Sequence, residues 1–360
     1  MTSRRTFRRL RSRFLSAFIS FSFVLVLLAT TACRRGGGGS GEYVYVAVPQ
    51  ANLRDRIAAV YNKVGVVKSG DRVEVLDRQK RFLRVRTSRK EEGWLEQRFT
   101  ITEDVYKQFE KLDADSRGLP PQGRAITRVT LHMHLTASRD GETLYQLAEG
   151  EKIDMLKRAT TERPEKPGAA AIAKSSAKAG APDPPPKVYD DWWLIRSQSG
   201  HYGWVLARMV DLDVPLDIAQ YAEGQRIQAA FILNEVQEED KNFPQYLVLL
   251  SEPKDGMPYD FNQIRVFTRN VKKHRYETAY RERNLVGFFP VKVGTENFEN
   301  EGTLPTFVVR LQAENGQIVQ RKYKLNNPIV RRVVLPGDDN LKLASSKKET
   351  PSKPAPKRRR

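Results

Sequence analysis

Few residues in this chain of 360 residues carry side chains suited to catalysis or metal binding. Two of the four histidines, His132 and His134, would project to one face of a β-strand and could share a metal ion. The spacing supplies no third ligand, because Asp140 or His201 could join them only through the tertiary fold. We therefore favour a surface or partly satisfied histidine pair, and we predict no metal site and no cofactor.

Nucleophilic catalysis has little support in the sequence. Ser175 and Lys178 match the Ser-x-x-Lys spacing of penicillin-interacting enzymes, but they lie in an Ala- and Pro-rich stretch without the further motifs of those enzymes. The chain has no Gly-x-Ser-x-Gly motif and no glycine-rich phosphate loop followed by Lys-Ser or Lys-Thr. The sequence thus predicts no catalytic residue and a protein that is not an enzyme.

Aromatic side chains offer a binding surface instead. The candidate ligand-binding residues fall into two groups, Tyr43, Tyr45, Phe82 and Trp94 in the first part of the chain, and Trp192, Trp193, Tyr202 and Trp204 further on. Trp94 and Trp204 recur at matching places, which either a ligand groove or packing in a core explains. The two interpretations differ in whether these tryptophans point outward or inward.

These aromatics belong to a sequence pattern that occurs twice. Residues 67–76 and 147–156 each carry a turn of Gly and an acidic residue followed by alternating apolar residues, and the copies close on Gly93-Trp94 and Gly203-Trp204. In each copy the closing glycine lies eleven positions after the aromatic that opens the preceding extended run. Alternation of apolar and charged residues indicates a sheet with one wet face. The pattern predicts a duplicated small β module.

The first copy, residues 42–100, contains four features in a fixed order: Asn52-Leu53-Arg54, Gly70-Asp71, Phe82-Leu83-Arg84-Val85 and Gly93-Trp94-Leu95. This order resembles the bacterial Src-homology-3-like domain, a small five-stranded barrel. Residues 125–213 keep the last three features and carry His134-Leu135-Thr136 in place of the first. The resemblance implies two such barrels in tandem, with peptidoglycan stems or another envelope protein as the ligand.

Two further segments are predicted to interrupt the barrels. Residues 101–124 are expected to form a linker with a short helix, because Thr100 and Glu103 fit a capping box ahead of apolar residues at helical spacing. Within the second copy, residues 159–187 are rich in Ala, Lys and Pro. Such a composition buries too little apolar surface to order itself, so we predict a disordered insertion.

Residues 214–335 contain seven runs typical of strands, at 226–236, 245–250, 263–267, 276–280, 286–293, 306–311 and 318–325. Asn315-Gly316 between the last two predicts a tight hairpin, because both residues accept the left-handed conformation of that turn. We expect a β-sandwich-like domain here. The predicted fold is therefore all-β, with two small Src-homology-3-like barrels in tandem followed by this C-terminal β domain.

The formal net charge of +19 is concentrated at the two ends of the chain. Residues 1–32 contain six arginines and no acid, whereas the middle of the chain is nearly balanced, which argues against a nucleic-acid partner. Residues 336–360 are predicted to be a disordered basic tail. Its candidate contacts to anionic envelope polymers or lipid headgroups are Lys357, Arg358, Arg359 and Arg360. A solubilising end is the alternative interpretation.

The N-terminus has the layout of a targeting segment, with arginines before an apolar run from Phe14 to Ala32. Thr30-Thr31-Ala32-Cys33 resembles a bacterial lipoprotein signal. That resemblance implies removal of residues 1–32, lipidation of Cys33 and a flexible tether over residues 33–41. An uncleaved membrane-spanning anchor is the alternative. Either one leaves most of the chain outside the cytoplasm.

These observations together indicate a non-enzymatic, membrane-anchored lipoprotein of the bacterial cell envelope. It would act as a binding or scaffold module for peptidoglycan or envelope proteins. The alternative is a cell-wall hydrolase, or an accessory subunit of one, with its activity in residues 214–335. The carboxylates available there are Glu235, Glu238, Asp260, Glu277 and Glu282, without a telling spacing.

Overall fold

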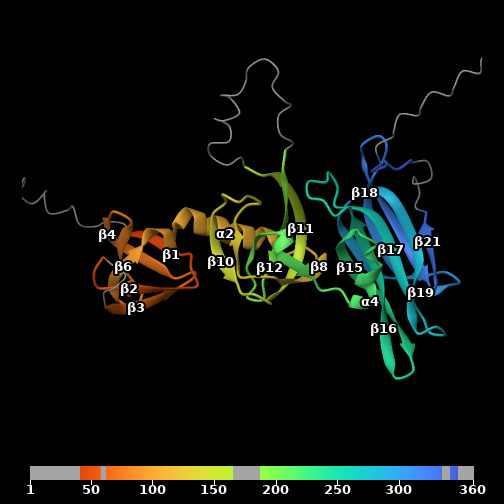
Figure 1. Cartoon of the computed structure of the whole chain (residues 1–360), viewed down its shortest axis with the longest axis horizontal. Coiled ribbons are helices and arrows are strands. Elements are labelled where there is room, and N and C mark those ends of the chain that lie inside the picture. Colours follow the sequence, from red (N-terminus) through yellow and green to blue (C-terminus); the bar gives the residue numbers. More distant parts are fainter. Residues whose placement is uncertain (1–40, 58–61, 165–186, 335–340, 348–360) are drawn as a thin grey trace, which may run out of the picture. The chain divides into compact units, whose positions relative to one another are not determined.

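The computed structural model describes residues 41–57, 62–164, 187–334 and 341–347. Within them the chain forms three seven-stranded antiparallel sheets, and the all-β prediction is confirmed (Figure 1). Two compact units are present: one holds the chain up to Val44 with residues 52–67 and 72–98, and the other holds residues 45–51, 68–71 and the chain from Phe99 onward. No described helix is long and apolar enough to cross a membrane.

Several of the residues singled out from the sequence lie outside the described part of the chain. They are the signal-like segment with Cys33, the Ser175 and Lys178 pair, and the basic residues Lys357 to Arg360. The proposed lipidation and the proposed contacts of the tail therefore stay predictions.

The first sheet has the strand order β3-β2-β6-β5-β4-β1-β7. Its strands are β1 (Glu42–Val46), β2 (Gln50–Arg54), β3 (Lys63–Lys68), β4 (Arg72–Gln79), β5 (Phe82–Arg86), β6 (Glu92–Glu96) and β7 (Thr100–Thr102), with the 3-10 helix η1 (Gln97–Phe99) before the last. Leu83 and Val85 of β5 are buried while Arg84 between them is exposed, as period-two alternation requires. Gly70 takes the left-handed φ of +85° in the turn before β4.

The second sheet repeats this order strand for strand, as β10-β9-β13-β12-β11-β8-β14. Its strands are β8 (Gly123–Thr127), β9 (Leu131–His134), β10 (Thr143–Leu147), β11 (Lys152–Glu162), β12 (Tyr189–Arg196), β13 (Tyr202–Leu206) and β14 (Val210–Leu212), with the 3-10 helix η2 (Ala207–Met209) before the last. Gly150, with a φ of +77°, takes the left-handed conformation that Gly70 takes in the first sheet. Val85 pairs with Gly93 in one sheet and Ile195 with Gly203 in the other.

The closing glycines explain why the two sheets share their register. A Cβ on Gly93 would lie 2.8 Å from the Cβ of Leu53, and a Cβ on Gly203 would lie 2.7 Å from the Cβ of Met133. Met133 is thus the counterpart of Leu53, so His132-Met133-His134 corresponds to Asn52-Leu53-Arg54. The sequence comparison placed His134-Leu135-Thr136 opposite Asn52-Leu53-Arg54, and this correspondence is wrong by two residues.

The predicted insertion at residues 159–187 begins too early. Ala159 to Glu162 belong to β11 and pair with β12, where Ala159 faces Trp192 and Glu162 faces Tyr189. Trp192 Nε1 also donates a hydrogen bond of 3.0 Å to Thr161 Oγ1. These bonds extend the hairpin beyond the point at which the composition changes. Residues 165–186 lie outside the described residues.

The expected helix between the two copies is α2 (Glu103–Ser116). Its N-cap is Thr102, whose Oγ1 accepts a hydrogen bond of 3.4 Å from the backbone N–H of Val105, and not Thr100, which lies in β7. Phe109 of the helix is buried against Leu144 and Ile101. The helix therefore packs on the second sheet through an apolar stripe.

The third sheet is a seven-stranded meander in sequence order. It comprises β15 (Arg226–Glu238), β16 (Lys241–Ser251), β17 (Phe261–Asn270), β18 (Arg275–Phe298), β19 (Gly302–Gln312), β20 (Ile318–Asn326) and β21 (Ile329–Val333). The helix α4 (Leu216–Ala219) and the 3-10 helix η3 (Gln220–Ala222) precede it. Ile218 of α4 joins Tyr246, Val248 and Leu250 in a second core, so alternate residues of β16 are buried on opposite faces.

Three details of this domain differ from the sequence prediction. The runs 276–280 and 286–293 belong to one strand, β18, which pairs with β17 in its first half and with β19 in its second half. Strand β21 was not predicted. The domain is built on a single sheet and not on two separate ones, because the long strand β18 pairs with β17 along its first half and with β19 along its second half.

The hairpin at Asn315-Gly316 also differs in its turn. Of the two residues only Gly316 has a left-handed φ, +84°. The Gly316 N–H donates to the Ala313 carbonyl at 2.9 Å, and the Ala313 N–H donates to the Gln317 carbonyl at 2.8 Å. The connection is thus a three-residue loop with glycine in its last position.

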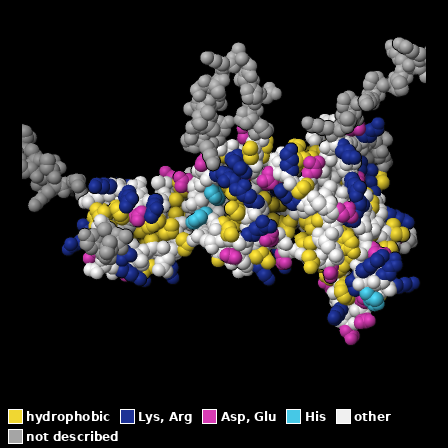
Figure 2. Space-filling view, viewed as in Figure 1, with side chains coloured by type: hydrophobic (Ala, Val, Ile, Leu, Met, Phe, Trp, Pro, Cys, Tyr) yellow, Lys and Arg dark blue, Asp and Glu magenta, His cyan; other side chains and the backbone are white. Residues whose placement is uncertain are grey.

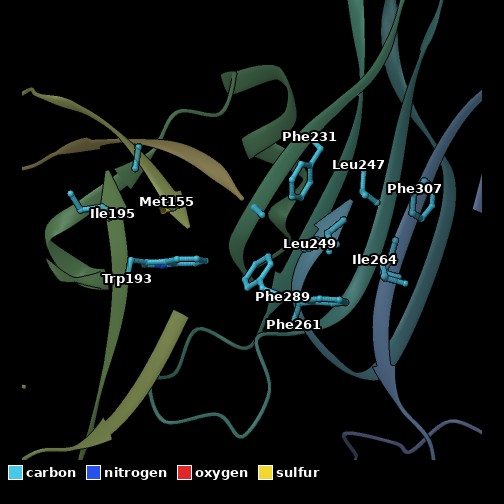
Figure 3. Packing of buried hydrophobic residues seen from close by; sticks show 14 of the residues in the cluster. Met155, Trp193, Ile195, Phe231, Leu247, Leu249, Phe261, Ile264, Phe289 and Phe307 are labelled. Atoms are coloured by element: carbon cyan, nitrogen blue, oxygen red, sulfur yellow. The ribbon is translucent and has the colours of Figure 1, made fainter. Parts of the chain in front are cut away.

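The second and third sheets share one hydrophobic core. Met155, Trp193 and Ile195 of the second sheet belong to the same buried cluster as Phe289 and Phe307 of the third. Figure 3 shows Trp193 directed toward Phe289 and Phe261, with Phe231 and Leu249 behind them. This continuity explains why these two sheets form a single compact unit.

Candidate functional site

The first sheet exposes an aromatic and arginine surface on neighbouring strands β5 and β6. Arg84 of β5 pairs directly with Trp94 of β6, and Phe82 pairs with Glu96. Since side chains alternate along a strand, Phe82, Arg84 and Trp94 lie on the same face. Arg84 is exposed, and the two aromatics are partly exposed. We call these three residues the Trp94 face.

Fixed charges border the Trp94 face. Arg84 lies 3.0 Å from Glu92, and Arg86 bridges Glu92 at 2.8 Å and Glu74 at 3.2 Å. The hydrogen bond from Arg86 holds the pKa of Glu92 below its ordinary value, so this carboxylate is ionised at neutral pH. The arrangement can stack an apolar ring face on Trp94 while charged donors and acceptors orient polar groups of a ligand.

Tyr43 and Tyr45 do not join this face as open surfaces. The guanidinium of Arg72 covers the ring of Tyr43 at 3.6 Å from its centroid. Tyr45 stacks on Tyr106 of α2, with ring centroids 3.7 Å apart. Tyr45 is therefore a packing residue, and Tyr43 is capped by a cation.

The second sheet places its candidate aromatics differently. Trp192, Trp193 and Tyr202 are buried, so they cannot line an open groove, and we remove them from the candidate ligand-binding set. The ring of Trp192 contacts His134 edge-on, with centroids 5.2 Å apart, and Trp193 faces the third sheet. Trp204 is only partly exposed, and it packs with Leu112 and Leu119 in a cluster that covers this part of the sheet.

Helix α2 holds this cover in place by polar contacts. Asp113 accepts a hydrogen bond of 2.8 Å from the backbone N–H of Tyr202 and lies 3.3 Å from His201 Nδ1. His201 in turn stacks on Tyr145, with ring centroids 3.7 Å apart. The face of the second sheet that corresponds to the Trp94 face is therefore covered by a segment of the same chain.

Residues 49–100 match the bacterial SH3 domain. This match confirms the Src-homology-3-like prediction for the first copy, and the Trp94 face lies within it. No curated protein matches the chain. Solved structures that match it include NlpC2 and NlpC1 from Trichomonas vaginalis and an NlpC/P60 family protein from Bacillus cereus ATCC 10987, each 9% identical. They cover 85%, 86% and 84% of this chain and 96%, 93% and 98% of their own chains, with TM-scores of 0.16, 0.16 and 0.21.

His132 and His134 of the second sheet differ in their surroundings. His132 is exposed, while the Nδ1 of His134 lies 3.2 Å from the Gly141 carbonyl oxygen. Burial lowers the pKa of His134. Among the described residues, no group of three or more His, Cys, Asp or Glu side chains is arranged to hold a metal ion.

The carboxylates considered for a hydrolase are also held apart by their own partners. Glu238 is paired with Arg269, which together with His274 lowers its pKa to about 2. Glu277 accepts from Asn270, Lys273 and Arg275, which lower its pKa to about 2, and Glu282 accepts from Tyr280 and Tyr323. Asp260 lies 3.1 Å from Arg158. These four carboxylates form separate ion pairs and hydrogen bonds.

Sequence reasoning missed a cluster of arginines around one buried carboxylate in the second sheet. Asp190 lies 2.6 Å from Arg139, 2.6 Å from Arg163 and 3.5 Å from Arg208. The hydrogen bonds from Arg139 and Arg163 hold the pKa of Asp190 well below its usual range. The Asp190-Asp191 pair immediately before two tryptophans was the available signal, since carboxylates seldom enter an apolar strand without cations.

The second of these carboxylates, Asp191, joins the second sheet to the third. It lies 2.8 Å from Arg158, whose Nη1 also donates to the Tyr259 carbonyl at 3.0 Å. Asp191 also accepts a hydrogen bond of 3.2 Å from the Gly256 N–H. Burial raises the pKa of Asp260, the other carboxylate at this junction. The junction is thus polar at its centre and apolar around Trp193.

Proposed function

We propose that this chain is a non-enzymatic binding module of the bacterial cell envelope whose SH3 domain binds peptidoglycan. The observation that carries the proposal is the Trp94 face, a partly exposed aromatic surface beside an exposed arginine inside the segment that matches the bacterial SH3 domain. Trp94 offers a flat apolar ring, and Arg84 and Glu92 beside it offer charged donors and acceptors. The peptide stems of peptidoglycan carry apolar groups that can pack on the ring and charged groups that can pair with the arginine and the carboxylate.

The second sheet is, in this proposal, a tandem SH3-like copy with a structural role. The identical strand order, the shared register at the closing glycine and the ion pair of Arg196 with Asp154, which repeats that of Arg86 with Glu74, support this view. Because α2 covers the face that corresponds to the Trp94 face, we assign wall binding to the first copy alone.

Attachment to the membrane completes the proposal. Lipidation at Cys33 after removal of residues 1–32 would keep the SH3 domain close to the wall, with residues 33–41 as the flexible tether that their Gly-rich composition predicts. Confinement to a surface raises the local concentration of ligand, so a weak individual site suffices. The localisation is accordingly the extracytoplasmic face of the envelope.

Co-sedimentation of the purified chain with murein sacculi tests the wall-binding function. Wild type is expected in the pellet, and Trp94→Ala is expected to reduce the binding constant about tenfold, the loss of one good aromatic contact. Phe298→Ala, which removes a partly exposed aromatic of the third sheet, is the matched control and is expected to bind as wild type. If wild type co-sediments with the sacculi at none of several salt concentrations, peptidoglycan is not the ligand.

Zymography with the same preparation tests the non-enzymatic part of the proposal. We expect no lytic band on a gel containing peptidoglycan. A clear band that disappears on mutation of a carboxylate in the third sheet would replace the proposal by the hydrolase alternative.

A further inference from the structure

The arginine cluster of the second sheet carries a surplus of positive charge. Arg139 comes from the loop after β9, Arg163 directly follows β11, and Arg208 comes from η2. All three ion pairs that the described structure gives these side chains go to Asp190. Three guanidinium groups therefore share one carboxylate. Figure 2 shows Lys and Arg side chains gathered over the part of the molecule that contains the second sheet.

The carboxylate is sequestered while the arginines are accessible. The side chain of Asp190 is 2% exposed, whereas those of Arg139, Arg163 and Arg208 are 33%, 37% and 42% exposed. Asp190 receives hydrogen bonds from Nε and Nη2 of both Arg139 and Arg163, and from Nη1 of Arg208. This leaves the Nη1 groups of Arg139 and Arg163 and the Nη2 group of Arg208 as donors for a further anion.

A cavity begins beside this cluster. It has a volume of about 300 Å³ and is lined by Arg208 together with Arg128, Arg226, Trp193 and Ile227. Arg128 is paired with Asp211, and Arg226 is paired with Asp255. The cavity thus offers apolar walls to an uncharged part of a ligand, with Arg208 at the boundary between the cavity and the cluster.

The first sheet lacks the corresponding arrangement. Counting back from the equivalent aromatics Phe82 and Trp192, Lys80 takes the place of Asp190. Arg98, which corresponds to Arg208 in the 3-10 helix, is paired with Glu96 at 2.7 Å. The cluster is therefore a property of the second copy.

We propose that Arg139, Arg163 and Arg208 form a binding site for a phosphate group, and that the remainder of the phosphorylated ligand enters the adjoining cavity. A phosphate monoester carries a charge near −2 at neutral pH, which offsets the two uncompensated guanidinium charges. Each remaining Nη group can donate a charge-assisted hydrogen bond to a different phosphate oxygen. The inference stands apart from peptidoglycan binding by the first sheet.

Isothermal titration calorimetry of the full chain with inorganic phosphate, at constant ionic strength, tests this site. Wild type is expected to bind phosphate saturably. Arg139→Gln and Arg208→Gln are each expected to weaken binding about tenfold, the value of one charge-assisted hydrogen bond. Arg275→Gln, an exposed arginine of the third sheet, removes the same charge and is expected to bind as wild type.

Several outcomes would overturn the proposal. They are no saturable phosphate binding by wild type, equal weakening by Arg275→Gln, or acetate binding as tightly as phosphate. If circular dichroism shows that Arg208→Gln has lost its fold, Arg139→Gln decides, since its side chain comes from a surface loop. Titrations with glycerol phosphate and with phosphatidylglycerol vesicles distinguish a soluble or polymeric phosphoester from a lipid headgroup as the source.

Discussion

The indole of Trp193 in β12 packs against the ring of Phe289 in β18, with ring centroids 5.3 Å apart and planes inclined by 56°. Trp193 is 3% exposed, and it meets a residue that lies more than ninety positions further along the chain, so the contact joins the second sheet to the third. This pair, and not a ligand groove, accounts for the aromatic at this position of the second copy.

Trp193→Ala should therefore destabilise the unit that contains the second and third sheets. We expect the free energy of unfolding to fall by about 3–5 kcal/mol, because the indole leaves a cavity in a packed core. Urea unfolding followed by far-ultraviolet circular dichroism measures the change. Trp94→Ala is the comparison, since its partly exposed ring should cost markedly less. Equal losses from the two variants would show that Trp193 does not join the sheets.

The buried ion pair at the same junction makes a second prediction. Arg158 and Asp191 are 4% and 1% exposed, so removal of the guanidinium leaves a buried charge without its partner. Arg158→Ala is expected to cost about 3–5 kcal/mol. Arg128→Ala, which breaks an exposed pair with Asp211, is expected to cost about 0–1 kcal/mol. Thermal unfolding in a low-salt and a high-salt buffer compares them, and only the Arg128 pair should be sensitive to salt.

The closing glycines can be tested in both copies. Gly93→Ala and Gly203→Ala place a methyl group within 2.8 Å of the side chains of Leu53 and Met133, respectively. We expect each to lower stability by about 1–3 kcal/mol through overpacking. Gly294→Ala in β18 is the control, because nothing lies within 4 Å of its added Cβ. A neutral Gly203→Ala variant would argue against the close approach of β13 to β9.

Asp190 should confer stability that depends on pH. Its pKa in the folded chain is depressed by Arg139 and Arg163 below the ordinary value of about 3.9. The stabilisation is therefore complete at neutral pH, above the pKa of the unfolded chain, and declines as the pH falls below about 4 toward the folded-state pKa.

The variant Asp190→Asn provides the measurement. At neutral pH it is expected to be less stable than wild type by about 1–3 kcal/mol, since the three arginines lose their charged partner. The difference should shrink on acidification, because protonation of wild type then removes the same charge. Melting temperatures of both proteins between neutral and acidic pH give the result. A difference that does not change with pH would mean that Asp190 is not ionised in the folded chain.

The first copy could be derived from sequence because its signals are local. A glycine turn, alternating apolar residues and a closing Gly-Trp each act over a few residues, and residues 49–100 match the bacterial SH3 domain accordingly. The partly exposed position of Trp94 follows from the same alternation. Most strands of the third sheet were predicted for this reason too; the exceptions are β21 and the polar stretch through which β18 continues between two apolar runs.

The second copy shows where local signals end. Its first loop differs in sequence from that of the first copy, so the correspondence of Met133 with Leu53 emerged only from their contacts with the closing glycines. Alternation of apolar and charged residues predicts that one face of a sheet is exposed to solvent. In the second sheet, however, α2 covers one face and the third sheet covers the other. Trp192, Trp193 and Tyr202 are buried as a result.

The class of fold and the exposed position of Arg84 follow from the sequence, because periodicity and turn chemistry act between near neighbours in the chain. Only the tertiary structure decided which tryptophans are core and which are surface, and that Arg139, Arg163, Asp190 and Arg208 meet. Those outcomes depend on which separate segments pack together, and packing among distant segments leaves no period in the sequence.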